Sequence, residues 1–388
     1  MTAPEHPRVV LGLQGVQTRD LAGSGVCRRA QDYLTALVAF QPEVVAGVSA
    51  DTGLAAPDVV PDLPPDVPLL DTNDPAPPSG QPGVLVFHAL ACTTQSPPLD
   101  ALWPRWARDP SVALVATADD VTAQELERPP HGSAGYRLRS IRNFLENADA
   151  VICESQSAAA AVSGAALVDP DRLHVVLQGC PPAHPVPEDP KVPVEGAFGA
   201  GRGMEPGHLL TITTGRLVSD MEVAIRAYAL LPEGIRNRHQ LVVAGWTSTS
   251  RAESLHDVAA SCGVSRRVVL LPGIGQAGCR SLLRSCHLAV LPRPDGPSVR
   301  PALEAIARGA PLLVGDVNPL REVVQDSSAR FDPGSVHSLY HAMARALTSD
   351  EILRELTDAP TFALKRHDWL ASTATAVGAY RAAASRRP

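Results

Sequence analysis

The chain has 388 residues, a length typical of two domains rather than one. Hydrophobic residues make up 45% and charged residues 19%, as in globular proteins, and the net charge of −7 argues against a nucleic-acid binder. No apolar run is long enough to span a bilayer. The first residues also lack an apolar signal core, so we expect a cytoplasmic protein.

The seven cysteines are scattered and odd in number, and none forms a Cys-x-x-Cys pair. This pattern argues against a zinc site or a disulfide framework and favours free thiols in a reducing compartment.

In the first half of the chain, short apolar runs alternate with helical patterns. Several runs are apolar throughout, which is typical of strands buried on both faces of a parallel sheet. We expect helices at Gly25–Phe40 and Tyr136–Asn147, and a long loop over Pro57–Gly83. The expected strands are Val9–Leu13, Glu43–Val48, Val84–His88, Val112–Thr117, Ala150–Cys153 and His174–Leu177.

Pro and Gly are dense between Pro181 and Gly207, which indicates an interdomain linker. A second alternating series follows, so we predict an α/β chain of two doubly wound sheets, with domains at 1–195 and 205–367. Ligands of such sheets lie at the carboxyl ends of the strands. The expected strands are Leu209–Thr213, Gln240–Ala244, Val268–Leu271, Leu288–Leu291 and Pro311–Val314, and the expected helices are Glu222–Leu231, Ala252–Cys262, Ala277–Ser285 and Ala302–Gly309.

The stretch Arg293–Gly309 is the most informative in the sequence. A buried strand ends at Leu291, a loop with Pro and Gly follows, and a helix opens near Pro301. Free N–H groups at such a helix start form a natural anion site. Glu304 lies about one turn into this helix, where its carboxylate can accept hydrogen bonds from a ribose diol. The alternative is a plain surface loop with a solvated Glu.

Gly215 and Arg216 follow the first strand of the second domain. The planar guanidinium of Arg216 suits a diphosphate, because it donates several hydrogen bonds in a fixed fork. The alternative is a surface Arg that caps a helix.

Together these motifs resemble the nucleotide domain of the retaining family-four glycosyltransferases. The Leu-Arg-Glu-Val-Val stretch at 320–324 and Phe-Asp-Pro-Gly at 331–334 match in order and spacing. The other matching stretches are Gly-Arg-Leu at 215–217, Val-Val-Ala-Gly at 242–245, Val-Leu-Leu-Pro-Gly at 269–273, Ala-Val-Leu-Pro at 289–292 and the run 301–311.

The first domain resembles this family more weakly. Gly23 and Gly25 are similar to the Gly-rich first loop, which faces the donor phosphates. The stretches 116–121 and 147–155 look like the mid-domain motifs of polysaccharide-type members. Trp369 with Tyr380-Arg381 looks like the final helix, which returns to the first domain, so residues 368–388 are expected to belong there.

The resemblance implies a GT-B fold with two Rossmann-like domains facing a cleft, and a metal-independent transferase without a cofactor. It implies a nucleotide-diphosphate sugar as donor and a small molecule or glycan as acceptor. Arg216 would neutralise the diphosphate and Glu304 would hold the ribose hydroxyls. Backbone groups around Gly273 and Ile274 would read the base, and amides in Pro297–Arg300 would meet phosphate or sugar. The implied donor-site residues are Gly23, Gly25, Gly215, Arg216, Gly273, Ile274, Ser298, Val299, Arg300 and Glu304.

Three positions depart from the family pattern. The Lys of the family falls on Met221, so one diphosphate cation is missing, and the first Glu of its Glu-x7-Glu pair falls on Gly296. Asp295 could replace that Glu, and Asp119 stands where the family has His or Tyr. Missing charge could come from Arg28, Arg29, Arg293 or Arg300. The candidate catalytic residues are Arg216, Asp295, Asp119 and Asp120.

Several alternatives stay open at this point. The departures allow a catalytically weak or inactive homologue that acts as a binding partner, whereas a GT-B isomerase would need a hydrolysing acid–base set that the sequence does not show. Asp119 and Asp120, with Glu125 nearby, could pair with a cationic acceptor such as an aminocyclitol. His88 ends a strand and is either a structural histidine or an acceptor-facing one. Ser155 is expected to cap the helix that follows it.

Overall fold

The structure is a computed structural model in which the chain forms two compact units, each built on its own seven-stranded sheet. Unit 1 comprises Met1–Gly179 and His367–Pro388, and unit 2 comprises Cys180–Asp295 and Val299–Arg366. The structure describes residues 7–13, 25–50, 67–71, 83–90, 103–118, 139, 141–180, 198–199, 205–212, 218–245, 249–272, 274, 276–292 and 299–387.

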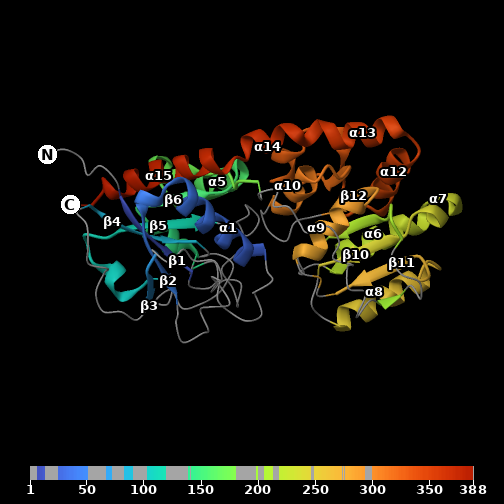
Figure 1. Ribbon diagram of the computed structural model, residues 1–388, viewed down its shortest axis with the longest axis horizontal. Helices are drawn as coiled ribbons and strands as arrows, with labels where there is room; N and C mark the ends of the chain where they lie inside the picture. Colours follow the sequence, from blue (N-terminus) through green and yellow to red (C-terminus); the bar gives the residue numbers. More distant parts are fainter. Residues whose placement is uncertain are drawn as a thin grey trace. The chain divides into compact units, whose positions relative to one another are not determined.

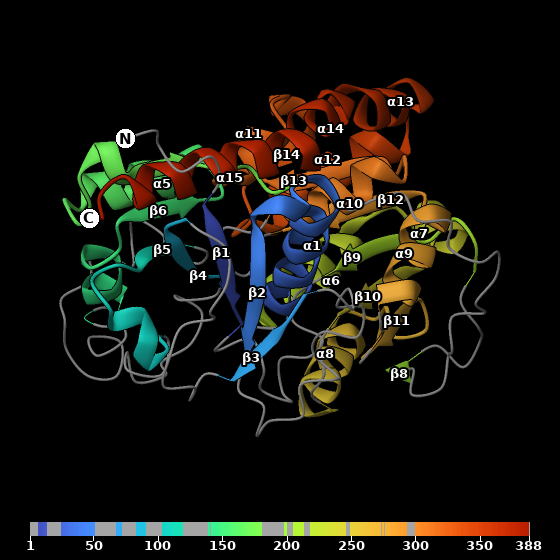
Figure 2. The same ribbon diagram turned by 60° about the vertical axis from the view of Figure 1, so that its left-hand side comes forward.

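The sheet of unit 1 is parallel throughout, with the strand order β3-β2-β1-β4-β5-β6-β7. Figure 2 shows β1, β2 and β3 side by side at one end of this sheet. The strands are β1 Arg8–Gly12, β2 Val45–Ala50, β3 Leu69–Asp71, β4 Leu85–Ala89, β5 Ala113–Ala118, β6 Ala150–Cys153 and β7 Leu173–Val175.

Alternate residues of these strands enter two separate cores, one on each face of the sheet. Val9 and Leu11 face α1 (Gly25–Phe40) and α15 (Trp369–Ala384), whereas Val10 packs on the opposite face. Along a strand, successive side chains point to opposite faces, so both cores draw on the same short apolar runs. Figure 1 shows α15, in red, lying along the unit 1 sheet.

The second face of the unit 1 sheet is covered by shorter helices. A 3-10 helix at Arg105–Arg108 contributes Trp106 to this core, and residues 141–146 are helical. Helix α5 (Gln156–Gly164) begins after Ser155, whose side-chain oxygen accepts a hydrogen bond from the Ala158 amide at 3.1 Å. The predicted helix cap at Ser155 is therefore confirmed.

Unit 2 repeats this architecture with the strand order β14-β13-β12-β9-β10-β11-β8. All of its pairings are parallel except that of β8 with β11, which is antiparallel. The strands are β8 Phe198–Gly199, β9 Leu209–Ile212, β10 Leu241–Ala244, β11 Val268–Leu271, β12 Leu288–Leu291, β13 Leu312–Gly315 and β14 Arg330–Phe331.

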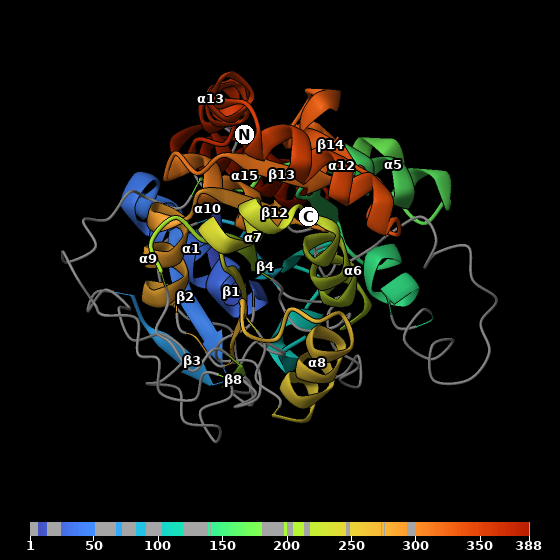
Figure 3. The ribbon, with the colours of Figure 1, turned by 90° about the vertical axis from the view of Figure 1, so that its right-hand side faces the viewer.

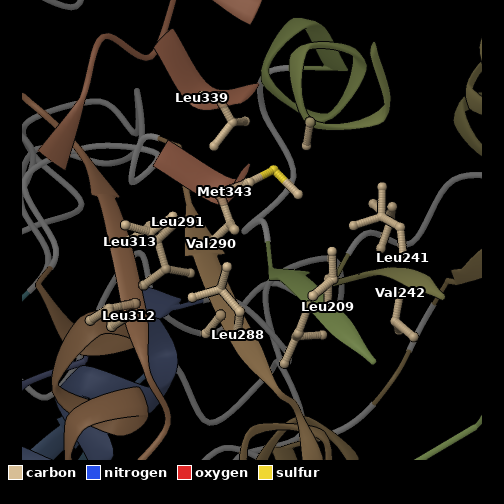
Figure 4. Close-up of a cluster of buried hydrophobic side chains, with 14 of the residues drawn as sticks. Leu209, Leu241, Val242, Leu288, Val290, Leu291, Leu312, Leu313, Leu339 and Met343 are labelled. Carbon is tan, nitrogen blue, oxygen red and sulfur yellow. The ribbon is translucent and has the colours of Figure 1, made fainter. Parts of the chain in front are cut away.

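A single large core holds unit 2 together. Leu209, Leu288 and Leu312 come from three neighbouring strands and lie in one buried cluster (Figure 4). Helix α6 contacts both α8 and α12, and Figure 3 shows α6 beside α8. The helices are α6 Val218–Leu230, α7 Glu233–Arg238, α8 Thr249–Ser261, α9 Gln276–Ser285, α10 Arg300–Ala307, α11 Leu320–Val323, α12 Val336–Leu347, α13 Asp350–Asp358 and α14 Phe362–Arg366.

The predicted α/β fold with two doubly wound sheets is confirmed, and so is the return of the final helix to the first unit. The prediction of an uninterrupted loop over Pro57–Gly83 is wrong, because Leu69–Asp71 pairs with β2 as the edge strand β3. The stretch predicted as a linker contains β8, and its residues 181–197 and 200–204 lie outside the described part. Of the helix predicted at 136–147, the structure describes 139 and 141–147.

Five cysteines of the described part carry free thiols, and Cys153 and Cys279 are buried. None of the described helices is long and apolar enough to cross a membrane. The free cysteines are Cys153, Cys180, Cys262, Cys279 and Cys286.

Candidate functional site

The sheet of unit 2 changes direction between β9 and β12. The chain runs from β9 through β10 to β11 on one side, and then returns to place β12, β13 and β14 on the other. The two central strands are parallel, with Val290 opposite Thr211. In open α/β sheets, ligands bind outside the carboxyl ends of the strands at such a switch point. Arg216 follows β9 in the sequence and Glu304 follows β12. The topology therefore indicates a ligand site at the carboxyl ends of these two strands.

Helix α10 starts soon after the carboxyl end of β12. It begins at Arg300, with Pro301 in its first turn, where the missing N–H of proline costs no hydrogen bond. Val299 precedes the helix and makes no side-chain cap, so the cap position does not occupy the first amides with its own side chain. The predicted helix start near Pro301 is confirmed.

A buried ion pair lies within α10. The Nε of Arg300 donates to Oε1 of Glu304 at 3.2 Å, and the two side chains are only 4% and 8% exposed. The reading of Glu304 as a solvated surface residue is therefore wrong. Arg300 stands one turn before Glu304, which lets the two side chains meet on one helix face. The guanidinium therefore holds this carboxylate in a fixed position.

The backbone of Glu304 is also engaged. Arg308 donates from Nη1 to the Glu304 carbonyl oxygen at 2.9 Å, at the end of the helix. Burial lowers the pKa of Arg308, and the Glu304 carboxylate opposes that shift. Arg300 thus holds the side chain of Glu304, and Arg308 holds its backbone carbonyl.

Met221 is part of the apolar core of unit 2. It lies in the second turn of α6 and is 1% exposed, packed among buried aliphatic side chains. A cation at this position would lose its hydration without a partner in that core. Met221 therefore fits its surroundings as a core residue. Arg300, at the start of α10, is a described residue that brings a guanidinium group close to the carboxyl end of β12.

Ile274 follows β11 and is half-buried. It lies directly over Gly278 of α9, where an added Cβ would come within 2.5 Å of the Ile274 side chain. The absence of a side chain at Gly278 lets the Ile274 loop lie close to the helix. The assignment of base recognition to this loop stays a prediction.

In unit 1, Gly25 is the first residue of α1. The roles proposed for Gly25, Val299, Arg300 and Glu304 stay predictions. The remaining predicted site residues lie outside the described part of the chain: Gly23, Asp119, Asp120, Gly215, Arg216, Gly273, Asp295 and Ser298, together with Gly296.

A chain of four polar side chains, which the sequence did not reveal, crosses the interior of unit 1. Tyr33 of α1 and Tyr380 of α15 share a hydrogen bond of 2.7 Å between their hydroxyls. The Tyr380 hydroxyl meets Nδ1 of His88 at 2.8 Å, and Nε2 of His88 meets Oγ1 of Thr117 at 2.7 Å. We call Tyr33, Tyr380, His88 and Thr117 the polar relay.

The polar relay is neutral. Burial lowers the pKa of His88 to about 3, so the ring carries no charge near neutral pH. Burial also raises the pKa of Tyr380, and the neighbouring Tyr33 adds to that rise. His88 is 0% exposed and bonded through both ring nitrogens, so it is a structural histidine rather than one that faces an acceptor.

Comparison with known proteins bears on unit 2. Residues 203–359 match the family model described as Glycosyl transferases group 1. The serotype-specific mannosyltransferase WbdA of Escherichia coli is 31% identical over 138 residues, which are 35% of this chain and 17% of that protein. A D-inositol 3-phosphate glycosyltransferase of Xylanimonas cellulosilytica is 28% identical over 229 residues, 57% of this chain and 54% of that protein. The chain thus matches about half or less of the length of these relatives.

Among solved structures, the sucrose-phosphate synthase of Thermosynechococcus elongatus superposes with a TM-score of 0.70 at 16% identity. The superposition covers 97% of this chain and 98% of that one, so the likeness in fold extends over both units. The family match includes β9 to β14 and the Arg300–Glu304 pair, which lie within residues 203–359. This chain has the GT-B fold, and residues 203–359 of its second unit match the model of the group 1 glycosyl transferases.

Proposed function

We propose that the protein is a metal-independent, retaining glycosyltransferase that moves a sugar from a nucleotide-diphosphate sugar to an acceptor hydroxyl. The observation that carries this proposal is the buried Glu304, held by Arg300 in the first turns of α10, inside the segment that matches group 1 glycosyl transferases. A carboxylate fixed in this way can accept hydrogen bonds from two ribose hydroxyls without first losing conformational freedom.

The chemical task that we assign to this edge is stabilisation of the leaving diphosphate. As the glycosidic bond breaks, the sugar becomes oxocarbenium-like and negative charge grows on the phosphate oxygens. Arg216 and backbone amides at the start of α10 would stabilise that charge, because oriented donors need no rearrangement during the reaction. This proposal requires neither a cofactor nor a metal ion.

The acceptor belongs to the proposal as well. We propose a small secondary metabolite, including a cationic aminocyclitol, or a cell-surface glycan, in the cytoplasm. The name of WbdA says that this protein transfers mannose. The name of the D-inositol 3-phosphate glycosyltransferases says that those proteins act on a cyclitol phosphate. A cyclitol and a glycan both carry several hydroxyls, which agrees with transfer to a hydroxyl group.

A nucleotide panel tests the donor site. Thermal unfolding is followed with UDP, GDP, ADP and TDP for the wild type and for Glu304→Gln and Arg216→Ala. We expect one nucleotide to raise the midpoint, and both variants to lose most of that rise.

Matched controls separate binding from stability. Glu233→Gln makes the same chemical change in α7, ahead of β10, and Arg226→Ala removes an exposed cation of α6. Both controls should keep the nucleotide-induced rise. If no nucleotide stabilises the wild type, the donor-site proposal is wrong.

The burial of Met221 favours a second candidate, a homologue that binds nucleotide or a partner without catalysis. The two candidates differ in turnover. A wild type that binds a nucleotide diphosphate but releases none from the matching nucleotide sugars, with water or any acceptor, supports the non-catalytic one.

A further inference from the structure

A pocket opens at the carboxyl edge of the unit 1 sheet. Its polar and aromatic walls come from Tyr33, Thr117, Glu154, Gln178 and Trp369, and aliphatic side chains complete it. The empty volume is about 350 Å³ with the open mouth included. Its enclosed depth has room for a group of about the size of a water molecule, so it suits the edge of a ring rather than a whole ring.

Gln178 brings an unused hydrogen-bond donor to this pocket. The residue is 3% exposed, and its side-chain Nε2 has no hydrogen-bond partner within the described part of the chain. Its backbone is fixed, because the Gln178 carbonyl bonds to Nδ1 of His367 at 2.6 Å, and the preceding Leu177 carbonyl accepts from Ser372 at 2.6 Å. Buried polar groups in native proteins normally have a partner, so this amide points to an acceptor supplied from outside.

Glu154 supplies the complementary acceptor. It follows β6 directly and is half-buried in the pocket wall. Burial raises the pKa of the neighbouring Cys153 to about 12, and the Glu154 carboxylate contributes to that rise. A carboxylate at this position accepts hydrogen bonds and repels anions.

The walls of the pocket are held in place. Tyr33 and Thr117 are the two ends of the polar relay, so His88 and Tyr380 fix them from behind. Trp369 lies against Gly179, where an added Cβ would come within 2.1 Å of the indole. A preorganised pocket loses little conformational entropy when a ligand enters.

We propose that this pocket binds the hydroxyl-bearing edge of a ring without negative charge, a neutral or cationic cyclitol or sugar, as the part of the acceptor that unit 1 recognises. A hydroxyl group both donates and accepts, so one hydroxyl can accept from the Gln178 amide while its neighbour donates to the Glu154 carboxylate. An amino substituent would gain further from Glu154. The acceptor role rests on the proposed glycosyl transfer, whereas the binding itself does not.

Fluorine NMR of the full chain labelled with 5-fluorotryptophan tests the binding without nucleotide. The Trp369 resonance is assigned with Trp369→Phe. The probes are myo-inositol, 2-deoxystreptamine and myo-inositol 3-phosphate, which are neutral, cationic and anionic. We expect myo-inositol or 2-deoxystreptamine to shift this resonance saturably, and the phosphate to bind at least tenfold more weakly than the better of them.

Variants of the pocket sharpen the test. Gln178→Leu should weaken binding about tenfold, whereas Gln325→Leu, the same change at an exposed position of unit 2, should leave it unchanged. Glu154→Gln should weaken 2-deoxystreptamine and reduce the discrimination against the phosphate. The absence of any shift, an unchanged affinity in Gln178→Leu, or preferred binding of the phosphate would each overturn the proposal. Nucleotide binding measured on the same samples tells failure of this pocket from failure of the donor site.

Discussion

The two units bury polar groups in opposite ways near the carboxyl edges of their sheets. Unit 1 holds the neutral polar relay, four hydrogen-bonding side chains of which His88 has both ring nitrogens engaged. Unit 2 holds a charged pair, Arg300 and Glu304, at 3.2 Å. A neutral network loses little when it leaves water, provided that its groups find partners. A buried ion pair costs more to desolvate, so it is weak evidence for stability and better evidence for a role in binding.

The difference also lies in how each group is assembled. The ion pair joins residues four apart on one helix, so formation of α10 alone brings them together. The relay joins Tyr33 to Tyr380 across 347 positions and Tyr380 to His88 across 292. It therefore exists only when α15 has docked on unit 1. The first is a local feature of a helix, and the second is a product of the completed fold.

Removing one member of the ion pair should have the largest effect. Glu304→Leu leaves the buried guanidinium of Arg300 without this carboxylate, which we expect to cost about 3–5 kcal/mol in unit 2. Hydrogen exchange of the β12 and β13 amides measures the loss separately from unit 1.

The double variant Arg300→Met with Glu304→Leu is the matched control. It removes both charges together and should recover most of the lost stability, while nucleotide binding stays lost. A single variant that costs less than about 1 kcal/mol would mean that this pair behaves as a solvated one.

The polar relay should respond less strongly to a single change. Tyr380→Phe deletes the hydroxyl that joins Tyr33 to His88, and we expect a cost of about 1–3 kcal/mol in unit 1 and none in unit 2. Exchange of the β4 and β5 amides reports on unit 1. Tyr340→Phe in α12, where the ring is half-buried, is the control. Equal protection in both variants would show that the relay contributes nothing to stability.

The same contrast between local and distant contacts explains what could be predicted from the sequence. Strands β6, β11 and β12 were predicted with their observed ends, because each is a continuous apolar run that starts after a polar residue and stops before a polar residue or a proline. The strands β3, β8 and β14 were missed, since they are two or three residues long. A strand so short is defined by the neighbour that pairs with it, not by its own pattern.

The candidate site divides in the same way. Glu304 stood out because a loop with Pro and Gly leads into its helix, and that signal is local. Its pairing with Arg300 follows from the spacing of four, although the sequence did not show that both are buried. Gln178 carries no local signal, and Tyr380 was recognised only as part of the final helix, not as a hydrogen-bonding partner of His88. Their positions depend on contacts between residues that are 189 and 292 positions apart in the chain.

Acid should destabilise unit 1 through His88 of the polar relay. Burial lowers the pKa of His88 to about 3, whereas an exposed histidine titrates near 6.5. Between these values the unfolded chain takes up a proton that the folded unit does not, so stability falls as the pH drops below about 6.5. We expect unit 1 to lose about 1.5 kcal/mol from this group between pH 6.5 and 5.

The variant His88→Gln removes this titration. Its stability should be lower at neutral pH, and should depend less steeply on pH in the same window. His208 provides the comparison in unit 2, where burial lowers the pKa to about 4, so His208→Gln should flatten the profile of unit 2 alone. Parallel profiles for wild type and His88→Gln would show that His88 already carries a proton in the folded unit.

The smallest effect is expected for the ion pair beyond the end of α15, and it tests whether this pair or the polar relay holds the helix on unit 1. Arg387 contacts Oδ2 of Asp149 through both Nε and Nη2 at 2.7 Å, and the two side chains are 23% and 15% exposed. Because water reaches both groups, Arg387→Ala should cost no more than about 1 kcal/mol. The loss should increase hydrogen exchange in the last turn of α15 and leave the turn around Tyr380 protected, whereas Arg381→Ala, an exposed residue of the same helix, should change neither. Loss of protection along the whole helix would instead assign the docking of α15 to its terminal ion pair, and the relay would then be a consequence of that docking rather than its cause.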